Sequence, residues 1–188
     1  MVSEDFKSVS PFSARRVMGP RPAILVISIS SDGKANGMTA AWTTPLSFDP
    51  PLVGVSIGVT RYTCQLIKES GEFTLNILDK RYLKQIHFLG TVSGREVDKL
   101  KECGLTIEKS KKVKAPHVAE AIGVLECRVE KEVETGDHVF FIGRVLEIYA
   151  KKGAYDHAED MYVLKKAKIP LYIGGAYYVI PADELLSP

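Results

Sequence analysis

Hydrophobic residues gather in several short runs along this chain, and in one of them they recur with a period of two, which is the spacing of a β-strand whose alternate side chains face opposite sides of a sheet. This run is the segment 52–60 (LVGVSIGVT). Its larger side chains share one face: Val53, Val55, Ile57 and Val59. Its other face has only small residues: Gly54, Ser56 and Gly58. Such a face lets backbone or ligand approach closely, so we expect a flat ligand to fit there.

Other short runs rich in β-branched and aromatic residues predict further strands. They are residues 21–30, 38–44, 72–78, 122–133, 138–150 and 171–180. Turn-forming residues separate several of them: Ser31-Asp32-Gly33, Asn36-Gly37 and the segment 134–137 (ETGD). Segments 21–30 and 38–44 therefore predict one hairpin, and 122–133 with 138–150 predict another. Pro45 and Asp49-Pro50-Pro51 are expected to interrupt the chain before residue 52.

Helical character is confined to shorter stretches. Residues 60–70 place Leu66 and Ile67 inward and end at Gly71, a helix stop signal. Residues 80–104 predict two short helices broken around 90–94, and residues 157–166 predict a helical turn. Because helices interrupt hairpins instead of alternating with strands, we expect a mainly β fold, an antiparallel barrel with a few peripheral helices and not a doubly wound sheet. The 188 residues predict one domain over 1–188, with 80–104 as a helical insertion.

Composition and charge narrow the class of protein. The chain has 45% hydrophobic and 26% charged residues, which is ordinary for a globular protein. The formal net charge of +2 is too small for a nucleic-acid-binding surface, and the basic stretch 109–114 (KSKKVK) is interpreted as a solvated loop. An OB-type nucleic-acid binder would need a basic groove with exposed aromatic residues, so the charge argues against that alternative. We therefore expect no nucleic acid partner.

The chain start and the cysteines suggest a location. Residues 1–12 have early acids and no long apolar run, so they predict neither a signal peptide nor a membrane anchor. Cys64, Cys103 and Cys127 are an odd number at wide spacings, which suits a reducing compartment better than a disulfide framework. We expect a cytoplasmic protein with no membrane partner.

Several catalytic motifs are absent: G-x-G-x-x-G, the Walker loop, H-E-x-x-H and C-x-x-C. The four histidines and three cysteines have no metal-ligand spacing, so no metal site is expected. Residues 54–58 match the nucleophile elbow G-x-S-x-G, but that elbow requires a sharp turn from strand into helix. Ser56 lies in the middle of an alternating strand, so a hydrolase is not favoured.

Two neighbouring stretches could together hold a flat heterocycle with an anionic tail. The first, residues 36–42 (NGMTAAW), combines turn residues and small side chains, so that backbone N–H groups can reach the polar edge of a ligand. The second, residues 60–63 (TRYT), has hydroxyls and Arg61 at a predicted helix start. Free N–H groups, the helix dipole and a guanidinium favour phosphate. A threonine cap beside a surface arginine is the alternative interpretation of this second stretch.

Several motifs, taken in their order along the chain, resemble those of the flavin reductase-like family with the FMN-binding split-barrel fold. This family includes flavoredoxins and ferric reductases. The motifs are Arg21-Pro22 with the strand after it, residues 36–42, Asp49-Pro50-Pro51, Ser56 with Arg61 and Thr63, and residues 73–77. Gly136-Asp137-His138 and the following VFFIGRV resemble the family's G-D-H strand, so the resemblance covers most of the chain. Two-component flavin reductases tend to have a serine-rich stretch where this chain has residues 58–61, which favours the flavoredoxin branch.

The resemblance implies an antiparallel split β-barrel of Greek-key type and a homodimer with non-covalent FMN near the subunit interface. The cofactor-binding residues would be Asn36, Met38, Thr39, Ala40, Ala41, Trp42, Ser56, Arg61, Tyr62, Thr63 and Asn76. The ring would lie over residues 38–42 and the phosphate near Arg61 and Thr63. His138 is the candidate catalytic residue, beside the flavin ring or the entry side of the reductant; an ordinary strand residue is the alternative.

Three of these residues have competing interpretations. Asn76 could bind the cofactor or satisfy backbone groups at a barrel rim. Trp42 and Tyr62 could stack on a ligand or fill a core or an interface. Cys64, beside the predicted phosphate site, could have a lowered pKa, but a buried and inert thiol is favoured.

If FMN is bound, the cofactor performs the redox chemistry and the protein orients it. We expect an electron-transfer oxidoreductase, with NAD(P)H as candidate substrate and a small molecule or redox protein as acceptor. The alternative is an FMN-binding electron shuttle with no NAD(P)H oxidation of its own.

Overall fold

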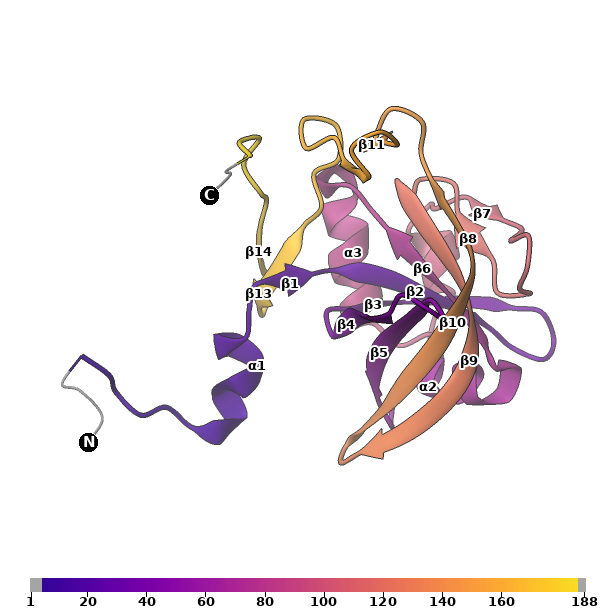
Figure 1. Cartoon of the computed structure of the whole chain (residues 1–188). Helices are drawn as coiled ribbons and strands as arrows, with labels where there is room; N and C mark the ends of the chain where they lie inside the picture. Colours follow the sequence, from indigo (N-terminus) through magenta and orange to yellow (C-terminus); the bar gives the residue numbers. More distant parts are fainter. Residues whose placement is uncertain (1–4, 186–188) are drawn as a thin grey trace.

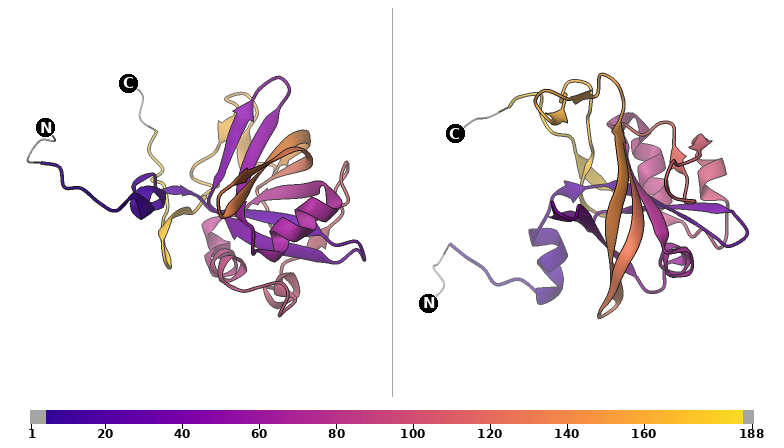
Figure 2. Two further views of the ribbon diagram at one scale, coloured as in Figure 1. Left: turned by 90° about the horizontal axis from the view of Figure 1, so that it is seen from below. Right: turned by 45° about the vertical axis from the view of Figure 1, so that its right-hand side comes forward.

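The computed structural model describes residues 5–185, and its architecture is mainly β. Within these residues seven antiparallel strands form the main sheet, in the spatial order β3-β2-β6-β9-β10-β5-β4. Their bounds are β2 Ile24–Ile29, β3 Ala35–Ala40, β4 Thr43–Ser47, β5 Leu52–Gly58, β6 Glu72–Ile77, β9 Gly123–Thr135 and β10 His138–Ala150. Figure 1 shows β9 and β10 as one long hairpin, and Figure 2 shows how strongly the sheet curves.

The edges of this sheet meet although no backbone ladder joins them. β3 forms one edge and β4 the other, yet only Ala41 and Trp42 separate them in the chain. Three residue steps of extended chain span at most about 10 Å. The sheet must therefore curl until its edges are neighbours at this point. The strand pairs observed do not close it, so the mainly β prediction is confirmed while full barrel closure is not seen.

A second, smaller sheet lies beside the first, in the order β1-β13-β14. It consists of β1 Arg21–Pro22, β13 Leu171–Gly174 and β14 Tyr177–Val179. β1 leads almost directly into β2, and pairing of Arg21 with Tyr172 brings the end of the chain back against its beginning. Two further two-stranded ribbons are formed by β7 Ile107–Glu108 with β8 His117–Val118, and by β11 Tyr155–Asp156 with β12 Met161–Tyr162.

The longer helices cover the sheet. α2, Tyr62–Ser70, buries Thr63, Cys64, Leu66 and Ile67, and it ends at Gly71, whose φ of 67° is the left-handed conformation that favours glycine. α3, Leu83–Thr91, buries Ile86 and Leu89. The remaining helical segments are the 3-10 turns Pro11–Ser13 (η1) and Lys80–Tyr82 (η2), α1 Ala14–Val17 and α4 Lys99–Glu102.

The hydrophobic core fills the inside of the curved sheet. On β5, the predicted inward face is confirmed for Val53, Val55 and Ile57, which are buried. Val59 is 52% exposed because the strand ends at Gly58. Phe73 and Phe141, from β6 and β10, are fully buried in the same core cluster.

Several predicted boundaries are wrong. Asn36-Gly37 is not a turn: both residues lie in β3, and the hairpin reverses at residues 31–34. The predicted strand 38–44 is divided between β3 and β4. Pro45 does not interrupt the chain but lies within β4, which is possible because β4 is an edge strand, where a missing N–H costs no ladder hydrogen bond.

The last two predicted segments also differ from the structure. Residues 171–180 form the hairpin β13–β14, because Gly175 has a φ of 59° and permits a tight turn. Residues 157–166 contain β12 and turns instead of a helical turn, since Tyr155 and Asp156 pair with Met161 and Tyr162. The two short helices predicted within 80–104 are confirmed, but α3 continues through Gly90.

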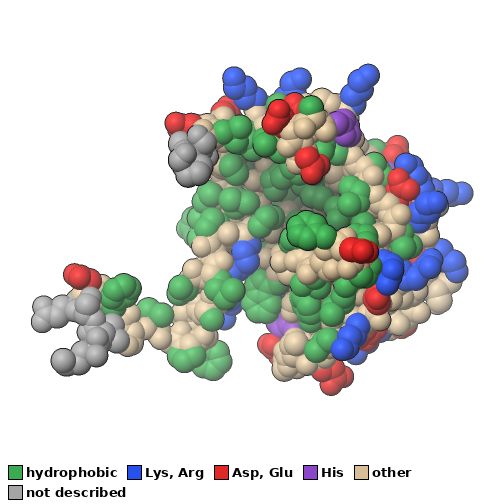
Figure 3. Space-filling model, viewed as in Figure 1, with side chains coloured by type: hydrophobic (Ala, Val, Ile, Leu, Met, Phe, Trp, Pro, Cys, Tyr) green, Lys and Arg blue, Asp and Glu red, His purple; other side chains and the backbone are tan. Residues whose placement is uncertain are grey.

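The segment from residue 5 to α1 extends away from the sheet on the side of β13 and β14 (Figures 1 and 2). It has large apolar side chains with high exposure: Phe6, Val9, Phe12, Val17 and Met18. Figure 3 shows hydrophobic side chains exposed on this arm and on the neighbouring side of the body. No helix among residues 5–185 is long and apolar enough to span a membrane.

Candidate functional site

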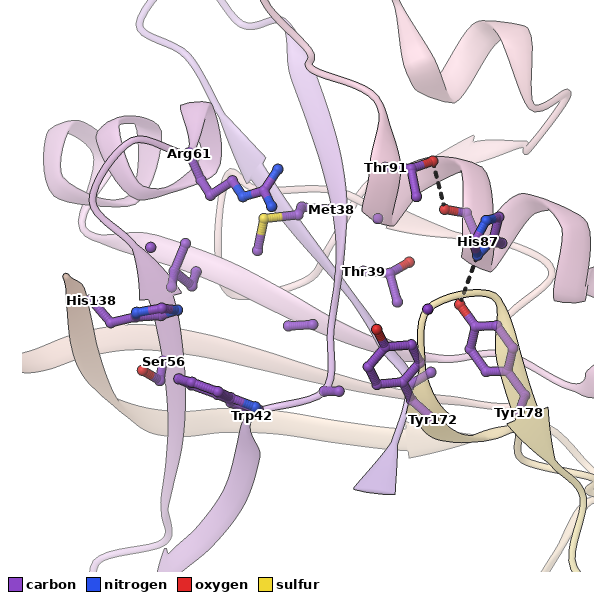
Figure 4. A pocket seen from close by; sticks show the side chains of 17 residues that line it. Met38, Thr39, Trp42, Ser56, Arg61, His87, Thr91, His138, Tyr172 and Tyr178 are labelled. Atoms are coloured by element: carbon purple, nitrogen blue, oxygen red, sulfur yellow. Dashed lines mark hydrogen bonds between the residues drawn. The ribbon is translucent and has the colours of Figure 1, made fainter. Parts of the chain in front are cut away.

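A cavity of about 230 Å³ opens where the two edges of the main sheet meet. We call it the main cavity. The end of β3 and the β3–β4 link line one side with Met38, Thr39, Ala40, Ala41 and Trp42. β5, the start of α2 and β10 add Ser56, Gly58, Arg61 and His138. Eight of the predicted site residues therefore lie around one cavity, as Figure 4 shows for those it labels.

One wall of the main cavity is a pair of stacked rings. Trp42 and His138 have ring centroids 4.7 Å apart and an interplanar angle of 27°. The His138 Nδ1 atom lies 2.7 Å from an Asp137 carboxylate oxygen, which fixes the orientation of the imidazole. The hydrogen bond to His138, followed by its charge, lowers the pKa of the Asp137 carboxyl. Trp42 is 39% exposed, so its ring presents surface to the cavity.

A second pocket, of about 190 Å³, adjoins the main cavity. We call it the cation pocket, because Arg61 and Lys99 both line it; Arg61 and Met38 are shared with the main cavity. Asn36, Tyr62 and Thr63 also line it. The Asn36 amide donates to the Thr63 hydroxyl at 2.8 Å, which links β3 to the start of α2. The two stretches that the sequence predicted to act together are thus joined at this pocket.

Lys99 has unusual surroundings for a lysine. It is only 4% exposed, and its ammonium donates to the Leu89 carbonyl at 3.0 Å. Burial, followed by the charge of Arg61, lowers its pKa from 10.5 to about 8. The Arg61 side chain has no hydrogen-bond or ion-pair partner among residues 5–185. Two cations that face one pocket with so few anionic partners favour binding of an anion.

The start of α2 adds backbone donors to this pocket. Arg61 is the N-cap residue, with extended backbone and no side-chain capping hydrogen bond. The first N–H groups of a helix have no partner within it, and the helix dipole makes this end positive. The loop after α3 covers the helix start, where Arg95 donates to the Thr60 carbonyl at 3.0 Å and its guanidinium lies over the Tyr62 ring.

Asn76 and Cys64 lie outside both cavities. The Asn76 side chain is fully buried, donates to Thr74 at 2.9 Å and accepts from the Val118 N–H at 3.0 Å. It therefore binds protein groups within and beside the sheet, which is the second of its two predicted roles, and it does not line either cavity. The Cys64 thiol is buried, and burial raises its pKa, in agreement with the predicted inert thiol.

Sequence reasoning missed the opposite wall of the main cavity. It comes from α3, with His87, Gly90 and Thr91, and from the β13–β14 hairpin, with Tyr172, Gly175 and Tyr178. It also missed Lys99 and Gly94 in the cation pocket. These residues are far from residues 36–63 in the chain. Only the tyrosine-rich run at 171–180 could have indicated a ligand-binding wall, and the sequence analysis interpreted it only as a strand.

A model of the flavin reductase-like domain matches residues 16–180 of the chain. The chain belongs to the flavin reductase-like family. A protein of Archaeoglobus fulgidus is 47% identical over 127 residues, which cover 68% of this chain and 72% of that protein. Among solved structures, an FMN-binding protein from Thermus thermophilus with bound cyclohex-2-enone superposes with a TM-score of 0.86 at 28% identity, over 100% of both chains.

The flavoredoxin of Desulfovibrio vulgaris is a further structural relative, with a TM-score of 0.82 and 25% identity over 100% of this chain and 96% of that one. These findings confirm the resemblance noted in the sequence, and they support a flavin cofactor and a flavin-related oxidoreductase activity for this member of the family. The G-x-S-x-G match at residues 54–58 needs no separate function, because a Cβ on Gly54 would overlap the Phe140 ring.

Proposed function

We propose that this flavin reductase-like protein is an FMN-dependent electron-transfer oxidoreductase of the flavoredoxin or ferric reductase type. One observation carries the proposal: a cavity with a flat wall, the stacked Trp42 and His138 rings, adjoins a pocket with two cations, and Arg61 faces both. FMN has a planar ring system joined to a phosphate, and the two spaces match these two parts. The FMN named for the Thermus thermophilus relative supports the choice of cofactor.

The cation pocket would hold the phosphate. Arg61 can form bidentate, charge-assisted hydrogen bonds to phosphate oxygens. Lys99 adds a buried ammonium, and the backbone N–H groups at the start of α2 add donors that a phosphate can accept from. A bound phosphate would also relieve the repulsion between Arg61 and Lys99, because each cation would then face negative charge.

The main cavity would hold the ring. Backbone N–H groups of Thr39, Ala40 and Ala41 are the candidate donors to its polar edge, and Trp42 with His138 forms a flat wall. When bound, FMN supplies hydride and electron transfer, so no side chain has to act as acid or base. His138, oriented by Asp137, keeps the role predicted from sequence, beside the ring or the entry side of the reductant.

The phosphate assignment is tested by comparing FMN with riboflavin, which lacks the phosphate. Arg61→Ala is expected to weaken FMN binding about 10- to 100-fold, because charge-assisted hydrogen bonds are lost, and to leave riboflavin binding nearly unchanged. Arg128→Ala is the matched control, since Arg128 is an exposed arginine on β9 that pairs with Glu72 and lines neither cavity. Unchanged FMN affinity in the Arg61 variant would refute the assignment.

The electron donor is proposed to be NADH or NADPH. Anaerobic addition of each nucleotide to the FMN-loaded protein should bleach the visible flavin bands if the chain is a reductase. Bound FMN that stays oxidised with both nucleotides would instead support the alternative, an electron shuttle that receives electrons from another protein. A small molecule or a redox protein is proposed as acceptor. Protein that remains colourless after addition of FMN would refute both.

We also propose that the chain forms a homodimer. The arm before β1 supports this, because Phe12, Val17 and Met18 are more than 70% exposed there. Apolar side chains gathered on a projecting segment usually mark a contact surface. Sedimentation equilibrium should give twice the mass of one chain, and replacement of Phe12 and Met18 by serine should shift the population towards monomer. A wild-type protein of single-chain mass would overturn the proposal.

A further inference from the structure

The wall of the main cavity opposite Trp42 contains a polar pair in aromatic surroundings. The His87 Nδ1 atom on α3 lies 3.3 Å from the Tyr178 hydroxyl on β14, and their rings meet edge to face at 86°. The Tyr172 ring lies 5.4 Å from the Tyr178 ring. Figure 4 shows the three side chains together, across the cavity from Trp42 and His138. The role proposed for FMN uses none of them.

This wall is held by contacts between distant parts of the chain. β13 pairs with β1, so that Tyr172 is opposite Arg21. The Arg16 guanidinium donates to the Ile173 carbonyl at 3.2 Å and lies over the Tyr172 ring. A Cβ on Gly174 would overlap that guanidinium, so the hairpin fits closely against the arm. The positions of both tyrosines are therefore set by the fold.

An open groove of about 340 Å³ continues from this wall to the surface. It shares His87, Thr91 and Tyr178 with the main cavity. The rest of its lining is mainly apolar: Leu83, Phe88, Ala176 and the exposed Lys84. A molecule that enters through this groove would thus pass apolar side chains first and reach the His87–Tyr178 pair before the main cavity.

The polar pair can serve one acceptor atom on such a molecule. The Tyr178 phenol keeps its proton at neutral pH, because its ordinary pKa is 10.0 and burial, followed by the nearby Tyr172, raises this pKa further. If His87 carries its proton on Nδ1, it donates to the Tyr178 oxygen and leaves the phenol O–H free to donate elsewhere. A single donor at the end of a mainly apolar groove fits a carbonyl oxygen on an otherwise apolar, flat molecule.

We propose that the His87–Tyr178 wall is a binding subsite for planar, conjugated carbonyl compounds, such as aromatic aldehydes, cyclic enones or quinones. Tyr178 donates to the carbonyl oxygen, and His87 is a positioning residue that orients the Tyr178 hydroxyl. The compound bound in this subsite would be the electron acceptor of the proposed flavin enzyme, and in that respect the inference rests on the proposed function. The cyclohex-2-enone bound to the Thermus thermophilus relative is a compound of this class.

The test compares two ligands of similar size, benzaldehyde and toluene, of which only the first has a carbonyl. Dissociation constants would be measured by ligand-observed NMR, with the flavin-free and the FMN-saturated protein. The wild type should bind benzaldehyde about three- to tenfold more tightly than toluene, the range expected for one hydrogen bond. Tyr178→Phe should remove this preference and leave toluene affinity unchanged, and His87→Leu should reduce the preference partly.

Tyr177→Phe is the matched control, because Tyr177 is on the same hairpin but 75% exposed and outside both cavities. It should behave like the wild type. A wild type with no preference for benzaldehyde would overturn the inference without any variant. If Tyr178→Phe weakens the binding of benzaldehyde and of toluene equally, the inference is also overturned, because the residue would then only maintain the shape of the wall.

Failure of the inference and failure of the proposed function are distinguishable. If FMN binds and benzaldehyde is not preferred, the subsite is wrong and the FMN site stands. If FMN does not bind but the flavin-free protein prefers benzaldehyde through Tyr178, the subsite stands as a carbonyl-binding site and the flavin function falls.

Discussion

The Trp42 indole stacks on the His138 imidazole with a centroid separation of 4.7 Å, although one residue links β3 to β4 and the other begins β10. The stack places the link between the two edge strands against the start of β10, beside the main cavity. Trp42 is also the only tryptophan of the chain. Its fluorescence therefore reports on this cavity alone.

The first prediction uses that signal. Addition of FMN should quench most of the tryptophan emission, because the flavin ring would lie within a few ångströms of the indole and absorbs at its emission wavelengths. Riboflavin should quench to the same final level at a higher concentration, since it lacks the phosphate. Trp42→Phe is the blank. Emission that stays unchanged while FMN is shown to bind by absorbance would place the ring elsewhere.

A second prediction concerns the buried charge of Lys99. Its pKa in the folded chain, about 8, lies below the ordinary 10.5, so between these pH values the unfolded chain keeps a proton that the folded chain has lost. Stability from this group therefore rises with pH across that window. Lys99→Met should abolish this rise. At pH 7 the free energy of unfolding of the variant should be about 1 to 2 kcal/mol higher than that of the wild type. The cost of burying a charged ammonium is removed, and the loss of its hydrogen bond offsets only part of this gain.

The same variant should bind FMN at least several-fold more weakly, with little change for riboflavin, because the methionine keeps the volume and removes the charge. Urea unfolding at pH 7, 8.5 and 10 together with flavin titration would check both parts. If the variant is less stable than the wild type at pH 7, burial of the charged ammonium does not destabilise the folded chain, and this prediction is wrong.

A third prediction concerns Glu126, a fully buried carboxylate on β9. Burial alone would raise its pKa, but the N–H groups of Lys111 (2.8 Å) and Lys112 (2.6 Å) and the Tyr149 hydroxyl donate to it, and the net shift is downward. The carboxylate of Glu126 therefore contributes to the free energy of unfolding above its ordinary pKa of 4.5. This contribution is lost as the pH falls through the lower pKa that the group has in the folded chain.

Glu126→Gln should cost about 1 to 3 kcal/mol at pH 7, because the amide replaces one charged acceptor and adds a donor where donors already converge. The difference in unfolding free energy between the two proteins should shrink below pH 4.5. Glu130→Gln is a suitable control, since that carboxylate is exposed and pairs with Arg144 at the surface. A constant difference down to pH 3 would contradict the assignment.

A fourth prediction concerns Gly143 in β10. A Cβ there would lie 2.5 Å from the Phe73 ring and 3.2 Å from the Cys127 Cβ, in the core of the sheet. Gly143→Ala should destabilise the fold by about 1 to 3 kcal/mol through overpacking. Adding Phe73→Leu should recover part of this loss, which a double-mutant cycle in urea would measure. Strictly additive effects would mean that the two side chains do not meet.

The sequence was sufficient for the parts of the fold that depend on local patterns. The alternation at 53, 55 and 57 located β5 and its inner face, and Gly71 and the Gly136 turn located the end of α2 and the β9–β10 hairpin. The residues at 36–42 and 56–63 were recognised because each stretch has its own chemical character. Both now line adjacent cavities.

What could not be predicted depends on contacts between distant residues. Lys99 was one of many lysines, and it is buried because α4 packs against both β3 and α3. Tyr178 and His87 are 91 residues apart, and their contact arises because β13 pairs with β1. Pro45 looked like a strand breaker because a sequence does not show which strand will be at an edge. The glycine face of β5 was only partly open, since Phe140 covers Gly54.

The two-residue connection from β3 to β4 has a consequence for how a ligand would act on the whole molecule. A sheet whose first and last strands are tied by Ala41 and Trp42 cannot flatten without withdrawing both residues from the main cavity. Opening the cavity and uncurling the sheet are then the same event. Ligand affinity should accordingly appear as thermal stability of the entire β structure, and amide hydrogens in β6 and β9, far from any ligand atom, should exchange more slowly once the cavity is filled.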